Sequence, residues 1–164
     1  MTLAETLLQE LEQEAQTTKR LLERVPNDHL GWRPHPTART LGELAQHIAT
    51  VPGAVAELSV TSPVQVPQFT DPPLRHANEL LPTLDGSLAR ARRALGVMSD
   101  ATLSASWRLM RGERELISIP RIAFLRSVML NHWYHHRGQL SVYLRALGVP
   151  IPLYGPSVDE NPFG

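Results

Sequence analysis

Cysteine is absent from the 164 residues of the sequence. Its absence excludes disulfide bonds, metal sites built from thiolates and catalysis by a cysteine nucleophile. For the same reason, cysteine usage does not reveal the cellular compartment. Other chemistry has to be found among the remaining residue types.

The sequence also lacks an excess of either charge and a long apolar run. Lys plus Arg and Asp plus Glu each number 16, so no general attraction to nucleic acid or to a membrane is expected. We interpret the basic cluster Arg90, Arg92 and Arg93 as a solvated helix face. No segment approaches 18 uninterrupted apolar residues, and the first 15 residues are acidic and amphipathic, unlike a signal peptide. We therefore expect a cytoplasmic protein without a nucleic-acid or membrane partner.

The composition that remains is typical of one globular domain. The sequence is 42% hydrophobic and 20% charged, and it has no internal repeat, glycine-rich phosphate loop or domain linker. Residues 1–164 are therefore expected to form a single domain. The spacing of apolar residues predicts an all-α fold with four helices, which cover about residues 2–25, 40–58, 76–97 and 120–147.

Local signals set the ends of these helices. Pro26 ends the first helix, and Thr40 with Glu43 forms a capping box that begins the second. Pro52 is expected to kink the second helix because it removes one backbone hydrogen bond. Gly148 and Pro150 end the fourth helix.

The connections between the helices differ in character. Residues 27–39 are expected to form an ordered loop with Trp32 as a plug. Residues 61–75 contain four prolines, and as an extended chain of roughly 50 Å they can return along a helix of about 30 Å. The sequence around Arg111 and Gly112 predicts a small hairpin inserted before the last helix. The proline-rich tail is not helical, and Ile151 and Tyr154 are expected to pack back on the helices.

Three histidines occur within five positions of the fourth predicted helix. At 100° per residue, His132 and His136 lie one turn apart on one face. His135 falls toward the edge of that face. The pair is expected in the middle of the core-facing stripe, which also contains Leu125, Val128, Met129, Leu140, Tyr143 and Leu147.

This pair is a candidate metal site. Imidazoles at positions i and i+4 can bind one ion together, although hydrogen-bonded core histidines would give the same pattern. His47 lies on the core-facing stripe of the second helix, so it adds a third inward imidazole. Three imidazoles from two helices can fill three positions of a tetrahedral ion and leave the fourth open. His29, His35 and His76 are expected to be exposed.

Several stretches of the sequence carry a family resemblance. The segments GWRP, TLGELAQHIA and HWYHHRGQLSVYLRALGVPIPLYGPS resemble the DinB/YfiT-like family of small metalloenzymes, over nearly the whole chain. The resemblance implies a four-helix bundle with long crossover connections, often dimeric. It also implies a divalent ion held by His47, His132 and His136. Zinc or nickel suits an all-imidazole site, and the sequence does not separate them.

The resemblance also suggests a reaction. Relatives include transferases that use low-molecular-weight thiols such as bacillithiol or mycothiol, so we expect metal-dependent transfer of a thiol to a small electrophile. A thiol cosubstrate would explain how a protein without cysteine performs thiol chemistry. One alternative is a metal-dependent hydrolase, because such an ion also lowers the pKa of bound water. The other is a non-catalytic binding or regulatory bundle in which the ion only holds the helices together.

Roles beyond the three histidines are assigned only as candidates. Gln139 and Tyr143, one and two turns beyond His136, can contact a substrate or complete the core. His135 is a candidate proton shuttle, or a surface residue. Glu43 precedes His47 by one turn and can either orient its imidazole or serve only the capping box.

Overall fold

The computed structural model describes residues 1–151 and is mostly helical with a small three-stranded sheet. Tyr154 lies outside the described residues, whereas Ile151 is fully buried, as expected. The helices are α1 (Leu3–Leu22), α2 (Leu41–Val60), α3 (Leu80–Gly96), α4 (Asp100–Ser104), α5 (Arg121–Phe124), the π-helix η3 (Leu125–Asn131) and α6 (His132–Ala146), with 3-10 turns η1 (Asn27–His29) and η2 (Ala77–Glu79).

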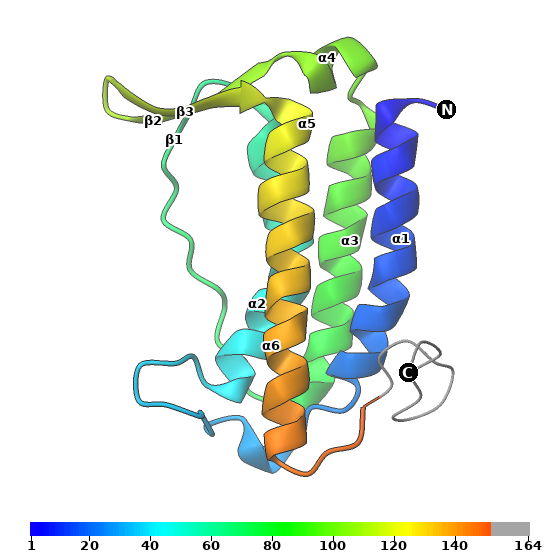
Figure 1. Ribbon diagram of the computed structural model, residues 1–164, viewed down its shortest axis with the longest axis vertical. Helices are drawn as coiled ribbons and strands as arrows, with labels where there is room; N and C mark the ends of the chain where they lie inside the picture. The colour runs from blue at the N-terminus through cyan, green and yellow to red at the C-terminus, as the bar shows by residue number, and fades with distance from the viewer. Residues whose placement is uncertain (152–164) are drawn as a thin grey trace.

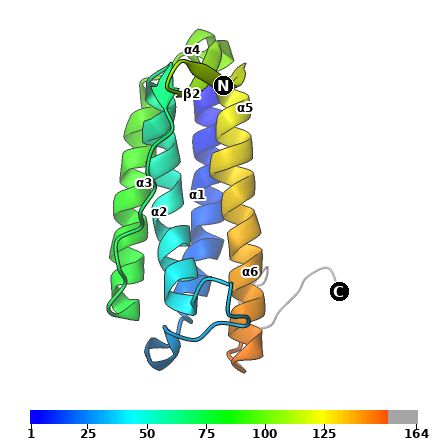
Figure 2. The ribbon, with the colours of Figure 1, turned by 90° about the vertical axis from the view of Figure 1, so that its left-hand side faces the viewer.

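The long helices lie side by side, and the sheet lies at one end of them and projects to one side (Figure 1). Helices α2 and α3 run in the same direction, so the chain between them must return along the molecule. Residues 61–76 make this return as a mostly extended segment, which we call the crossing segment (Figures 1 and 2). Within residues 1–151, no helix is both long and apolar enough to cross a membrane.

The predicted helix boundaries agree with the structure to within a few residues. Thr40 Oγ1 accepts a hydrogen bond from the Glu43 backbone N–H at 3.1 Å, and a Glu43 carboxylate oxygen accepts one from the Thr40 N–H at 2.7 Å. The predicted capping box is therefore confirmed. Gly148 follows α6 with a φ of +71°, a left-handed conformation that glycine adopts without a steric penalty.

Pro52 leaves one carbonyl of α2 without its usual partner. Because proline has no N–H, it cannot donate to the carbonyl of Ile48, four residues earlier. The indole Nε1 of Trp133 on α6 donates to this oxygen at 2.9 Å. The interruption in α2 thereby becomes a fixed contact with the helix that contains His132 and His136.

The predicted hairpin is confirmed as strands β2 (Ser106–Arg111) and β3 (Arg114–Pro120), which pair antiparallel around Gly112. A two-residue strand, β1 (Val64–Gln65), adds a parallel edge to β2 that the sequence did not predict. Two residues are too few to show an alternating pattern. The sheet fastens the beginning of the crossing segment to the end of the helices.

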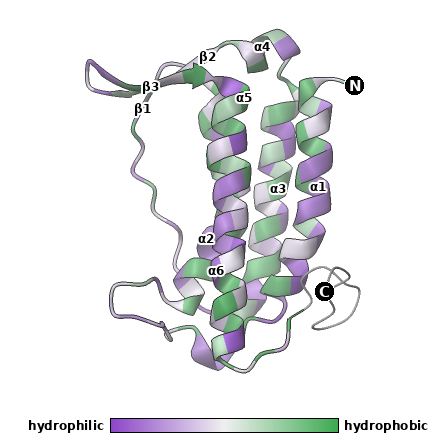
Figure 3. Ribbon diagram, in the orientation of Figure 1, coloured by the Kyte–Doolittle hydropathy of each residue, from purple (hydrophilic) through white to green (hydrophobic). Residues whose placement is uncertain are grey.

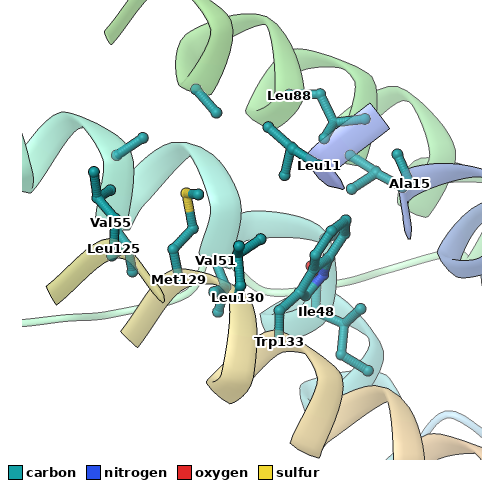
Figure 4. Packing of buried hydrophobic residues seen from close by; sticks show 14 of the residues in the cluster. Leu11, Ala15, Ile48, Val51, Val55, Leu88, Leu125, Met129, Leu130 and Trp133 are labelled. Carbon is teal, nitrogen blue, oxygen red and sulfur yellow. The ribbon is translucent and has the colours of Figure 1, made fainter. Parts of the chain in front are cut away.

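The hydrophobic core lies between the long helices, which alternate hydrophobic and hydrophilic patches along their lengths (Figure 3). Trp133 is fully buried in the middle of it (Figure 4). Trp107 is also fully buried and stacks on Phe124 with ring centroids 3.8 Å apart. Trp32, predicted as a plug, is only half-buried and makes an edge contact with the Tyr143 ring at 5.5 Å.

The fourth predicted helix departs from regular geometry just before the histidine pair. Seven residues, Leu125–Asn131, form a π-helix, in which each turn contains more residues than an α-turn. A projection at 100° per residue therefore assigns the wrong phase across this segment. Trp133 occupies the core, and His132 and His136 are half-buried at the margin of the buried stripe rather than at its centre.

Candidate metal centre

Three imidazoles from two helices meet beside the core. His47 lies in the second turn of α2, His132 begins α6, and His136 follows one turn later. The Nε2 atoms of His132 and His136 are 2.6 Å apart, and the Nε2 atoms of His47 and His132 are 3.4 Å apart. One nitrogen from each ring lies within 4.8 Å of the others, so the three side chains can hold a metal ion.

Each ring is also held by its other side. His47 Nδ1 lies 2.7 Å from Asp71 Oδ2, and His136 Nδ1 lies 2.7 Å from Gln139 Oε1. His132 makes a hydrogen bond to the backbone of Val128. Hydrogen bonds from Nδ1 to an oxygen fix the ring tautomer and orientation in many metal-binding histidines.

The hydrogen bonds on the opposite side of each ring determine whether its Nε2 atom carries a lone pair or a proton. An imidazole whose Nδ1–H donates to an oxygen carries a lone pair, not a proton, on Nε2 when it is neutral. With all three rings in this state, three lone pairs point toward one another at short range. A shared cation relieves that repulsion, so the donor set fits a divalent ion that accepts imidazole ligands.

Burial and the neighbouring charges also favour neutral imidazole rings in the cluster. Burial lowers the pKa of His136 to about 4 and also lowers the pKa of His132, with the nearby His47 adding to the effect. Burial acts to raise the pKa of Asp71, but hydrogen bonds from His47 and Thr50 outweigh it and the pKa is lowered. At neutral pH, therefore, His132 and His136 are neutral and Asp71 is ionised, as metal coordination requires.

Asp71 is the residue of this site that sequence reasoning missed. It lies in the crossing segment, 24 residues from His47, and its second oxygen accepts a hydrogen bond from Thr50 Oγ1 at 2.5 Å. Glu43, the candidate for orienting His47, is exposed and binds the Thr40 backbone instead. The only available signal was that the crossing segment was expected to return along α2 and contains one aspartate.

A cavity of about 560 Å³ adjoins the cluster and is bounded in part by His47 and His132. Its other walls come from α2, the crossing segment, α3, η3 and the loop before α2, and they comprise Arg39, Thr50, Val51, Ala54, Val55, Phe69, Thr70, Asp71, Pro72, Thr83, Arg90 and Val128. Volumes of this size accommodate small molecules. The histidines therefore face a space that can admit a substrate.

The other candidate residues take different positions around the cluster. Gln139 is exposed and contacts His136, and the Tyr143 hydroxyl donates to the Arg39 carbonyl at 3.2 Å. His135 is exposed, with its ring centroid 5.1 Å from that of His136. None of these three lines the 560 Å³ cavity.

The remaining histidines stay apart from the cluster. His29 lies beside Asp28, His35 contacts Thr37, and His76 precedes η2. Among the described residues, His47, His132 and His136 are the one group of metal-ligating side chains close enough to share an ion. No fourth protein ligand joins them in this part of the chain.

Comparison with known proteins agrees with this architecture. A DinB-like protein from Bacillus cereus superposes with a TM-score of 0.69 at 26% identity, over 92% of this chain and 96% of the other. A DinB-like protein from Bacillus subtilis gives 0.69 at 21% identity, over 91% and 96%. A search of curated proteins finds no match. The family model of the DinB family matches residues 1–161, so the chain belongs to the DinB family.

Proposed function

We propose that this protein is an enzyme that depends on a divalent metal ion held by His47, His132 and His136. The observation that carries the proposal is the convergence of ring nitrogens from three histidines beside a cavity of about 560 Å³, with hydrogen-bond partners on the opposite sides of the His47 and His136 rings. In this proposal the long helices serve as a four-helix bundle that holds the ligands. Zinc and nickel are the ions that we expect.

The chain's own residues prepare the site. Asp71 orients His47 and adds negative charge beside it, while Gln139 orients His136. When bound, a divalent ion in such a site supplies a Lewis acid that stabilises a thiolate or lowers the pKa of water. Thr50 keeps Asp71 in place through its hydroxyl group.

The reaction that we favour is transfer of a low-molecular-weight thiol to a small electrophile. The thiol releases its proton to solvent water, its sulfur forms a bond to an electrophilic carbon, and the leaving group departs with the electron pair of the bond that breaks. The family resemblance supports this choice. The absence of cysteine from the sequence is consistent with it, because the sulfur must then come from a cosubstrate.

A site open on one side also argues against a purely structural ion. Structural zinc sites are usually closed by four protein ligands, whereas catalytic sites have three and leave one position open. Here two of the three imidazoles, His47 and His132, line a cavity, and no fourth ligand is present among residues 1–151. A non-catalytic bundle would not need that cavity.

The first experiment measures metal content by elemental mass spectrometry on protein without a histidine tag. We expect close to one zinc or nickel ion per chain in the parent protein after reconstitution, and almost none in His47→Ala and His136→Ala. His29→Ala is the matched control, because His29 is a histidine outside the cluster. It should bind as much metal as the parent.

A folded parent protein that binds neither ion would overturn the proposal. If metal is bound, incubation of the loaded protein with a thiol and a small electrophile distinguishes the reactions by mass spectrometry. A thiol adduct that forms only with the parent protein and the His29→Ala variant supports thiol transfer. Addition of water instead would identify a hydrolase.

A further inference from the structure

We propose that the molecule bound in the 560 Å³ cavity carries an anionic group, and that the guanidinium group of Arg39 binds it. This inference rests on the proposed metal function, since the reacting end of the molecule is placed at the histidines. It adds a substrate class: small amphipathic anions whose charged group is joined to the reacting atom by a short apolar chain.

Arg39 is the cation that the site leaves available. It lines the 560 Å³ cavity and also a second cavity of about 690 Å³ on the same side of the molecule. Its Nη1 atom forms a long ion pair with Asp71 Oδ2 at 4.0 Å, which is beyond hydrogen-bond distance. Both Asp71 oxygens are already engaged, by His47 and Thr50. Within residues 1–151, no hydrogen bond uses the Arg39 guanidinium.

Arg39 also lies close enough to act on the histidine cluster. Its positive charge contributes to the lowered pKa values of His132 and His136. The loop that contains Arg39 is fastened to α6 by the hydrogen bond from the Tyr143 hydroxyl to the Arg39 carbonyl. Tyr143 is therefore a positioning residue for Arg39 rather than a group that lines the cavity.

Arg90, the other arginine of the cavity wall, is in a different state. Its Nε atom lies 3.3 Å from Glu57 Oε2, so a carboxylate already balances its charge. It packs across Gly53, where an added Cβ would lie 2.9 Å from the guanidinium. Arg90 thus belongs to the packing of α2 against α3, and Arg39 remains as the cavity-lining cation with only a long ion pair and no hydrogen bond from its guanidinium group.

The remaining cavity wall suits a short hydrocarbon chain. Val51, Ala54 and Val55 follow His47 along one side of α2, and Val128 faces the same space from η3. Apolar walls with a few convergent polar groups are typical of small-molecule sites. A ligand with its reacting atom at the histidines can therefore place an apolar chain on this wall and direct a carboxylate toward Arg39.

Two probe thiols test this assignment. The protein is loaded with cobalt(II), and the sulfur-to-cobalt absorption band is titrated with 3-mercaptopropionate and with the neutral 3-mercapto-1-propanol. We expect the parent to bind the mercapto acid about tenfold more tightly, because a charge-assisted bidentate contact is available to the carboxylate alone. The comparison cancels the contribution of the shared thiol group.

Variants then test which residue binds the carboxylate of the mercapto acid. Arg39→Met should reduce the tenfold preference to about one, and Arg39→Lys should keep most of it. Arg33→Met is the matched control, because Arg33 lies in the same loop but lines neither cavity. Tyr143→Phe should give an intermediate preference if it acts by positioning Arg39.

The outcomes separate this inference from the proposed function. If no cobalt is bound, or if neither thiol produces the band, the proposed thiol chemistry fails and this inference fails with it. If both thiols bind equally well to the loaded parent, only the anion assignment is overturned. A preference that survives Arg39→Met would likewise contradict the role of Arg39.

Discussion

Two polar sites lie at different heights along the helices, one buried and one half-buried, and their polar atoms are paired in opposite ways. At the sheet end, Arg121 is 6% exposed, and its Nε and Nη1 atoms donate to the carbonyls of Ser59 and Thr102 at 2.6 and 2.5 Å. Donors there face acceptors. In the histidine cluster, one ring nitrogen from each of three imidazoles faces the others, and each is an acceptor when the opposite Nδ1 carries the proton.

This difference in pairing distinguishes a site that stabilises the fold from a site that can bind a ligand. A buried donor that meets a carbonyl contributes to folding and leaves nothing to bind. Converging acceptors at the edge of a cavity oppose folding slightly until a cation joins them. We therefore expect changes at the Arg121 site to affect stability alone, and changes in the histidine cluster to affect metal binding above all.

The largest expected effect on stability comes from Arg121→Met. Removal of the guanidinium leaves the buried carbonyl of Ser59 and the partly buried carbonyl of Thr102 without donors, so we expect the free energy of unfolding to fall by about 3 kcal/mol. Urea denaturation of the metal-free protein measures this loss. Arg126→Met is the control, because its pairing with Glu10 is at the surface and should contribute less than about 1 kcal/mol.

The metal content of folded Arg121→Met protein should equal that of the parent. A variant that stays as stable as the parent but loses its metal would break the comparison between the two sites. Partial loss of both properties would indicate that they are coupled through the helices.

A change in the histidine cluster should instead abolish the stability that metal binding adds. Free zinc at 100 times its dissociation constant should raise the free energy of unfolding of the parent by about 2.7 kcal/mol, because only the folded state presents the three imidazoles together. In His136→Ala the same zinc concentration should add almost nothing. An equal increment in both proteins would place the bound zinc elsewhere.

A smaller effect tests the partner of His47. Asp71→Asn keeps the size of the side chain but removes the charge that holds the His47 ring, so metal affinity should fall by roughly 10- to 100-fold. Competition with a chelator of known affinity measures the change. Glu43→Gln should leave the affinity unaltered, because the Glu43 carboxylate caps α2 and does not contact His47. Reversal of these two results would restore Glu43 as the orienting residue.

The sequence predicted those parts of the molecule that depend on local patterns. The helices, the Thr40 capping box and the hairpin around Gly112 all follow from residues close together in the chain. His47 was selected together with the pair on the fourth helix because core-facing positions repeat along each helix. The structure brings these three histidines together.

The missed features depend on contacts between distant residues. Asp71 reaches His47 only because the crossing segment returns along α2, and no helical or strand pattern marks its side chain. The π-helix before His132 leaves no distinct pattern in composition, yet it shifts the phase of α6 and places Trp133 in the core. Trp133 in turn compensates for Pro52, a pairing that no single helix reveals.

The smallest expected effect is a pH dependence of the metal-free protein. The pKa of His136 falls from 6.5 to about 4 on folding, and that of His132 is also lowered. The unfolded state therefore binds more protons than the folded state as the pH falls below 6.5, and stability is lost progressively toward pH 4. Because the rings are only half-buried, solvent screening limits the loss between pH 7 and 5 to about 1 kcal/mol.

Urea denaturation at pH 7 and 5 in the presence of a chelator measures this loss. His136→Leu removes one of the titrating rings, so its stability should fall less over the same interval. Asp71 does not confuse the result, because its pKa is lowered from 3.8 and its contribution is lost only at still lower pH. Parent stability that is the same at pH 7 and 5 would mean that the folded protein accommodates protonated rings as readily as the unfolded chain does.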